Sequence, residues 1–119
     1  MWQDPTQEHL NSLNPALRDS AFWLVYFARS VGIPLWISSS VRTPTEQAAL
    51  VKAGRSLTMN SKHLTGQAFD VDVLGHSRSS VPRYVWDWLG DLAEYLGMGW
   101  GGRFAGFWDP GHFESRTLN

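Results

Sequence analysis

The sequence of 119 residues contains no cysteine. This absence excludes disulfide scaffolds, cysteine-based zinc sites, thiol nucleophiles and iron–sulfur clusters. An excess of basic charge is missing as well, because 10 Lys and Arg residues stand against 11 Asp and Glu residues. Binding to a nucleic-acid backbone depends on such an excess, so the composition argues against a nucleic-acid partner.

Long apolar runs are also lacking. The longest, at 21–28, is far shorter than the ~20 residues that a membrane-spanning helix needs, so we expect no membrane insertion. The segment 1–14 has neither the basic nor the apolar region of a signal peptide, which predicts a protein left in the cytoplasm unless another agent releases it. The length and the absence of repeats predict one domain over 1–119, and nothing suggests more than a monomer.

Apolar periodicity predicts a helix over 14–32, with Asn14 as its N-cap. In this interpretation Trp23, Tyr26 and Phe27 widen the apolar face, so that the helix is buried around much of its circumference. Of the 7 tryptophans, those in predicted helices are expected in the core, and those beside the later motif are candidates to line a substrate groove. The first group is Trp23, Trp86 and Trp88, and the second is Trp100 and Trp108, with Phe107.

The remaining elements are predicted from alternation, caps and turns. Thr43 and Glu46 form a capping-box pattern at the start of a short helix that ends near Gly54. The absence of strict strand–helix alternation indicates an α+β domain with a small, mostly antiparallel sheet packed against helices. The other expected elements are strands over 34–41 and 68–74, a helix over 80–97, and short strands joined by turns over 98–114.

Two segments concentrate side chains capable of chemistry. In the first, His63 precedes the predicted strand 68–74 and Asp70 lies within it, so a turn at Thr65-Gly66 would bring the imidazole and carboxylate together. Such a pair is a weak signal alone, and Asp72 shares the face of Asp70.

The second segment is Asp109-Pro110-Gly111-His112, a turn sequence in which Gly111 tolerates a positive φ. The turn brings the Cα atoms of Asp109 and His112 within ~7 Å. On the strand that follows, His112 and Glu114 share a face. Glu114 is an alternative to Asp109 as the base, or a partner for the second nitrogen of a ligating histidine.

Two imidazoles and one carboxylate are the ligand count of a catalytic zinc site, which keeps a fourth position for water. His63, Asp70 and His112 supply that set. A carboxylate outside the set would accept the proton of the water, and Asp109 is placed for this role. His9 and Lys62 are expected to be solvent-exposed surface groups.

The pattern S-x-H-x-x-G-x-A-x-D at 61–70, followed by W-G-G…D-x-x-H-F-E at 100–114, resembles the M15 zinc peptidases. These are D-alanyl-D-alanine carboxypeptidases, VanX/VanY-type enzymes and phage L-alanyl-D-glutamate endopeptidases of the Hedgehog/DD-peptidase fold. The resemblance covers residues ~14–115 by the order and spacing of the motifs. It implies Zn²⁺ on His63, Asp70 and His112, and Asp109 as the catalytic carboxylate. The upstream S-S-x-R-[ST]-x-x-x-Q stretch at 39–47 implies that Arg42 stabilises the oxyanion.

The compact chain is most similar to the phage endolysin branch of that family. The resemblance therefore implies hydrolysis of the L-alanyl–D-glutamate bond in the peptidoglycan stem peptide, in host cell lysis once a holin opens the membrane. A D-Ala-D-Ala carboxypeptidase or dipeptidase with the same zinc site is the alternative enzyme, and a non-catalytic zinc-bearing wall-binding module is the alternative outside catalysis. One departure concerns Gly111, since relatives commonly carry proline directly before the second histidine.

Overall fold

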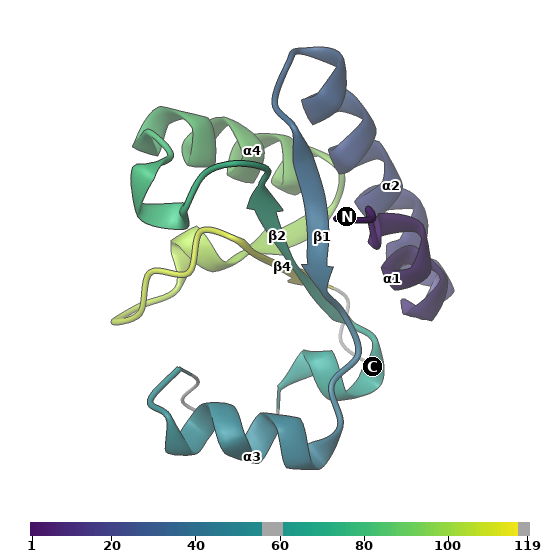
Figure 1. Ribbon diagram of the computed structural model, residues 1–119, viewed down its shortest axis with the longest axis vertical. Helices are drawn as coiled ribbons and strands as arrows, with labels where there is room; N and C mark the ends of the chain where they lie inside the picture. Colours follow the sequence, from purple (N-terminus) through teal and green to yellow (C-terminus); the bar gives the residue numbers. More distant parts are fainter. Residues whose placement is uncertain (56–60, 117–119) are drawn as a thin grey trace.

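The computed structural model describes residues 1–55 and 61–116. Over these residues the chain forms an α+β fold with one antiparallel sheet in the strand order β1-β2-β4-β3, which confirms the predicted fold class (Figure 1). The helices are α1 (Thr6–Ser12), α2 (Pro15–Ser30), α3 (Pro44–Lys52) and α4 (Arg83–Tyr95), and the strands are β1 (Leu35–Ser39), β2 (Ala68–Val73), β3 (Met98–Trp100) and β4 (His112–Ser115). Single 3₁₀ turns are η1 (Lys62–Thr65), η2 (Arg78–Ser80) and η3 (Gly101–Arg103).

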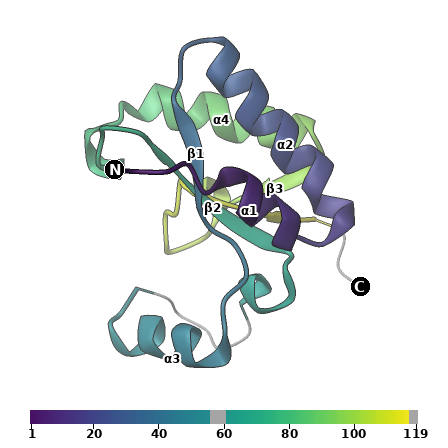
Figure 2. The ribbon, with the colours of Figure 1, turned by 45° about the vertical axis from the view of Figure 1, so that its right-hand side comes forward.

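The hydrophobic core lies between the sheet and helices α2 and α4, while α3 stands apart beyond the ends of β1 and β2 (Figures 1 and 2). Alternate residues of β2 face this core, as the strand pattern predicted. None of the helices in the described ranges is long and apolar enough to cross a membrane. The central core residues are Leu24, Leu35, Ile37, Phe69, Val71, Trp86, Leu89 and Phe113.

Helix α2 begins as predicted, because the side chain of Asn14 accepts a hydrogen bond from the amide of Ala16 at 3.0 Å. The prediction of a wide buried face is wrong. Trp23, Tyr26 and Phe27 are 43%, 53% and 39% exposed, and their rings pack against one another along the outer surface of the helix. Only a narrow stripe of smaller apolar side chains on α2 is buried against the sheet. The aromatic side chains on either side of this stripe are exposed to solvent.

The core assignment of Trp88 is also wrong, because its side chain is 40% exposed on α4. Trp86 is fully buried, as expected, and its indole N–H donates to the carbonyl oxygen of Arg78 at 3.2 Å. The two tryptophans are two positions apart on a helix of 3.6 residues per turn, so they project in nearly opposite directions.

Helix α1 lies in a segment for which the sequence predicted no element. The helix carries the buried side chain of Leu10 into the core, which explains its formation in a largely polar stretch. His9 therefore does not lie in an irregular solvent-exposed segment. Its Nδ1 atom lies 2.6 Å from the hydroxyl oxygen of Ser40, just beyond the end of β1.

Helix α3 starts with the predicted capping box. The amide of Glu46 donates to the Thr43 hydroxyl at 3.1 Å, and the amide of Thr43 donates to the Glu46 carboxylate at 3.0 Å. The buried side chain of α3 is that of a polar residue, Gln47. This helix is thus fixed by its cap and by polar contacts more than by apolar burial.

Gly90 in α4 allows close packing against Trp100, and we predict that Gly90→Ala destabilises the fold. A Cβ atom at this position would lie 2.2 Å from Cδ2 of the buried Trp100 ring. Alanine favours helices by ~1 kcal/mol over glycine. Because the ring is enclosed and has no free space, we expect the clash to outweigh this gain and to lower the free energy of unfolding by about 1–3 kcal/mol in urea denaturation.

The control is Asp87→Ala on the same helix, where the side chain is 51% exposed. We expect a change below ~0.5 kcal/mol there. A Gly90→Ala protein as stable as the wild type would show that the helix and the indole separate at no cost, against this account.

Candidate functional site

The register of β2 and β4 creates the centre of the site. Asp70 is the cross-strand partner of His112, and the two side chains approach to 3.2 Å between Oδ1 and Nδ1. The neighbouring pair, Phe69 and Phe113, points to the opposite face and stacks in the core at 5.6 Å between ring centroids. Core packing on one face of the sheet therefore sets the polar pairing on the other.

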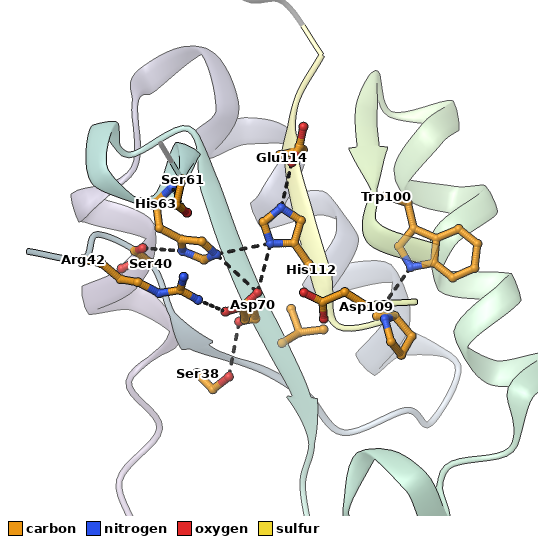
Figure 3. Close-up of polar contacts among 12 residues, drawn as sticks. Ser38, Ser40, Arg42, Ser61, His63, Asp70, Trp100, Asp109, His112 and Glu114 are labelled. Atoms are coloured by element: carbon orange, nitrogen blue, oxygen red, sulfur yellow. Dashed lines mark hydrogen bonds and ion pairs between the residues drawn. The ribbon is translucent and has the colours of Figure 1, made fainter. Parts of the chain in front are cut away.

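His63 reaches this pair from η1, which lies directly before β2. The turn predicted at Thr65-Gly66 is present, with Gly66 in the left-handed region at φ 71°. Gly66 also packs tightly, since a Cβ there would lie 3.2 Å from the backbone of Ser12. The result places His63 Nε2 at 3.3 Å from His112 Nδ1 and 3.4 Å from Asp70 Oδ1 (Figure 3).

Hydrogen bonds assign the free nitrogen of each imidazole. His63 Nδ1 donates to the carbonyl oxygen of Ser40 at 2.7 Å, which leaves Nε2 with a lone pair toward the centre. The Nε2 atom of His112 lies 2.8 Å from Glu114 Oε1, which leaves Nδ1 for the centre. Of the two roles that the sequence offered for Glu114, base or partner of the second nitrogen of a histidine, the structure shows the contact of the second.

The three groups could hold a metal ion, since one donor atom from each of His63, Asp70 and His112 lies within 4.8 Å of the others. All three residues are buried. Two imidazole nitrogens and one carboxylate oxygen form a donor set that suits zinc and leaves coordination positions open. The chemistry of the donors and the free lone pairs fits such an ion.

Charge in the buried cluster is strongly coupled. Burial raises the pKa of Asp70, but the interactions with His112 and His63 outweigh it and hold that pKa well below its usual range. For His112, burial lowers the pKa, yet the hydrogen bonds to Asp70 and Glu114 raise it to about 9. A proton on His112 and a cation bound between the three groups would both interact with the Asp70 carboxylate. Protonation of His112 therefore competes with binding of the cation.

Arg42 lies beside this cluster, between β1 and α3. Its guanidinium donates to Asp70 Oδ2 at 2.8 Å and to Gln47 Oε1 at 2.9 Å. The Arg42 backbone amide also donates to the carbonyl oxygen of His63 at 3.0 Å. The side chain is 15% exposed, so its charge is held in a fixed place at the edge of the cluster.

Asp109 stands on the other side of His112, at the start of the predicted turn. The amide of His112 donates to the Asp109 carbonyl oxygen at 3.2 Å, which closes that turn. The Asp109 side chain is 24% exposed and turned toward the cluster (Figure 3). Burial, together with the negative charge of Asp70, raises the pKa of this carboxyl group.

The reason predicted for Gly111 is wrong. Its φ is not positive; instead, a Cβ would lie 2.8 Å from both the Arg78 guanidinium carbon and the Val71 carbonyl oxygen. Glycine is needed here for close approach. Trp100 likewise does not line a groove, because it is buried and its indole N–H donates to the Pro110 carbonyl oxygen at 2.9 Å.

A cleft of about 960 Å³ opens over the cluster, between α3 and the loop that ends at Asp109. Phe107 lines it, as expected, and so does Arg78, which sequence reasoning missed. Arg78 belongs to no local motif. It lies six positions after Asp72, and the fold alone brings it to its partners. Lys62 is not a free surface charge, because its ammonium donates to Glu114 Oε2 at 2.7 Å.

The fold and this site define a class of protein that comparison with known sequences identifies. The sequence pattern of the D-alanyl-D-alanine carboxypeptidase family of M15 peptidases matches residues 54–115. The chain therefore belongs to the M15 peptidase family, as the resemblance predicted.

Individual relatives agree with this membership. The L-alanyl-D-glutamate peptidase of Listeria phage A118 is 33% identical over 114 residues, which cover 89% of this chain and 39% of the phage protein. The chain thus spans well under half the length of that relative. The L-Ala D-Glu endopeptidase ChiX of Serratia marcescens has a similar fold, with a TM-score of 0.78 and 23% identity over 96% of this chain and 88% of ChiX. VanY of the VanB-type resistance cassette, solved with Zn(II), has a TM-score of 0.62 and 20% identity over 88% of this chain and 73% of VanY.

Glu114 supports His112, and we predict that Glu114→Ala weakens binding of a divalent metal by about 10- to 100-fold. Without the carboxylate, the imidazole loses the bond that orients it and favours the Nδ1 lone pair. Glu114→Gln keeps an acceptor for the same N–H, so its loss should be smaller. Isothermal titration calorimetry with zinc measures both affinities.

Glu94→Ala is the matched control, since Glu94 lies on α4, outside the cluster, and pairs with Arg103. Its zinc affinity should equal that of the wild type. Equal affinities for Glu114→Ala and Glu94→Ala would contradict a supporting role for Glu114.

Proposed function

We propose that this chain is a zinc-dependent peptidoglycan peptidase that hydrolyses the L-alanyl–D-glutamate bond of the stem peptide. One observation carries the proposal: His63 Nε2, Asp70 Oδ1 and His112 Nδ1 converge beside a cleft that Asp70 and Asp109 line. The activities of the phage relative, an L-alanyl-D-glutamate peptidase, and of ChiX, an L-Ala D-Glu endopeptidase, support the choice of bond. The catalytic unit in this proposal is one domain over 1–119 that acts as a monomer.

His63, Asp70 and His112 would hold the zinc ion. When bound, zinc supplies a Lewis acid and lowers the pKa of a coordinated water to about 7. Ser40 and Glu114 keep the two imidazoles in the tautomers that ligation requires. The zinc-bearing VanY structure has the same fold, which supports this choice of metal.

Asp109 acts as the general base and then as the general acid. Its carboxylate takes a proton from the attacking water and returns it to the amine that leaves as the amide bond breaks. A raised pKa suits this double role, because a group that accepts and then releases a proton works best when its pKa approaches the working pH. Because it is partly exposed to the cleft, the Asp109 carboxylate can reach both the attacking water and the leaving amine.

Arg42 stabilises the negative charge that develops on the carbonyl oxygen. Its bonds to Asp70 and Gln47 fix the guanidinium before substrate arrives, so little reorganisation is needed as the oxyanion forms. The remaining N–H groups of the five-donor fork are available to the cleft. Peptidoglycan is then the partner, reached from the host cytoplasm by the release typical of phage lysis enzymes.

A D-Ala-D-Ala carboxypeptidase is the second candidate, favoured by the description of the family whose pattern matches residues 54–115. The same groups would perform the same steps on the terminal bond of the stem peptide. The two candidates differ in which product is released.

The test is digestion of purified Gram-negative sacculi by the zinc-loaded protein, with mass spectrometry of the soluble fragments. We expect peptides that begin at D-glutamate. Asp109→Ala should lower the rate by about 10²- to 10⁴-fold, since it removes the proton acceptor. A chelator should abolish release, and added zinc should restore it.

Asp91→Ala serves as the control, since Asp91 is an exposed carboxylate on α4 that pairs with Arg103. This variant should digest sacculi at the wild-type rate. Release of terminal D-Ala alone would replace the first candidate by the second. No release by a folded, zinc-loaded wild type would refute both enzymes and favour a wall-binding module.

A further inference from the structure

Arg78 lies in η2 and lines the same cleft as Arg42. Its guanidinium carbon packs against Gly111, where even a Cβ atom would come within 2.8 Å. The Arg78 NH1 atom lies 3.5 Å from Asp109 Oδ1. Arg78 is therefore in contact with both the carboxylate of the turn and the turn's backbone.

Two hydrogen bonds to β2 hold the Arg78 guanidinium in place. Arg78 Nε donates to Asp72 Oδ1 at 2.9 Å, and NH2 donates to the carbonyl oxygen of Val71 at 3.2 Å. Both acceptors belong to β2, the strand that carries Asp70. The planar fork of arginine fits this set of three acceptors, which a lysine ammonium on a flexible stem would not reproduce.

The bonds connect the turn to the sheet. Asp109 lies on a loop between η3 and β4, and the amide of Val71 in β2 donates to the carbonyl oxygen of Gly111 in the same loop at 2.8 Å. Arg78 adds a side-chain link between this loop and β2. A carboxylate on a loop is otherwise free to rotate away from the cluster, and a misplacement of 1 Å is enough to slow catalysis ~100-fold.

We propose that Arg78 is a positioning residue that holds the Asp109 carboxylate beside the cluster of His63, Asp70 and His112, with Asp72 as its anchor on β2. This inference rests on the proposed function, because it gives Asp109 the role of proton carrier. Arg78 acts through Asp109: two hydrogen bonds to β2 and the ion pair with Asp109 engage its guanidinium.

A double-mutant cycle on the zinc-loaded protein tests this inference. Cleavage of a soluble stem peptide is measured for the wild type, Arg78→Ala, Asp109→Ala and the double variant, with kcat and KM determined separately. We expect Arg78→Ala to lower kcat about 10- to 100-fold with KM nearly unchanged. In the Asp109→Ala background, Arg78→Ala should have no further effect, because the group that it positions is already gone.

Two more variants separate positioning from folding. Asp72→Asn keeps Arg78 but weakens its anchor, so kcat should fall less than in Arg78→Ala. Arg29→Ala is the matched control: Arg29 is also bound by a carboxylate, Asp4 at 2.8 Å, and by a backbone carbonyl, that of Leu35 at 2.8 Å, but it lies outside the cleft. Its kcat should equal that of the wild type, and zinc content and thermal midpoints are measured for every variant.

The outcomes are distinct. A rise in KM with unchanged kcat, or equal losses in the wild-type and Asp109→Ala backgrounds, overturns the positioning role while the proposed function stands. A loss of zinc or a fall in thermal midpoint that accounts for the lost activity also overturns it. A wild type that cleaves no stem peptide refutes the proposed function, and the inference with it. Loss of kcat confined to the background that contains Asp109 supports it.

Discussion

The pairing of β2 with β4 sets the positions of Asp70 and His112, around which the other groups of the site gather. Phe69 faces Phe113 in the core, and the next pair, Asp70 and His112, faces the cleft. A slip of one residue would exchange the faces and bury the polar pair among apolar side chains. The stacked phenylalanines therefore oppose such a slip, and the hydrophobic effect that folds the sheet also fixes the geometry of the polar cluster.

Burial of three titratable groups carries a cost that the surrounding residues offset. Each member has at least one partner outside the cluster: His63 bonds the Ser40 carbonyl, Asp70 bonds Arg42, and His112 bonds Glu114. These partners are held in turn, for example by Lys62 on Glu114. Removal of one side chain leaves others without a partner, so the supporting residues carry more weight than their distance from the reaction suggests.

The sequence was sufficient to predict the residues that meet, because two local devices control their approach. The Thr65-Gly66 turn and the turn from Asp109 to His112 are short-range features with known residue preferences, and alternation along β2 gave the facing of Asp70. Helix α2 shows what failed, since periodicity does not reveal how wide a stripe the sheet covers. The contacts of Arg78 depend on where the loop after β2 returns, which no local pattern encodes.

Helix α3 has consequences for the width of the cleft. It forms one wall, yet the buried side chain that it contributes is the amide of Gln47 rather than an apolar group. Breaking its contacts would expose little hydrophobic surface, so local opening of this wall costs much less free energy than opening of the sheet. The width of the cleft on this side thus depends on polar contacts more than on the core. Because Gln47 Oε1 also accepts the bond that fixes Arg42, displacement of this wall would release the guanidinium, whereas His63, Asp70 and His112 are carried by η1, β2 and β4.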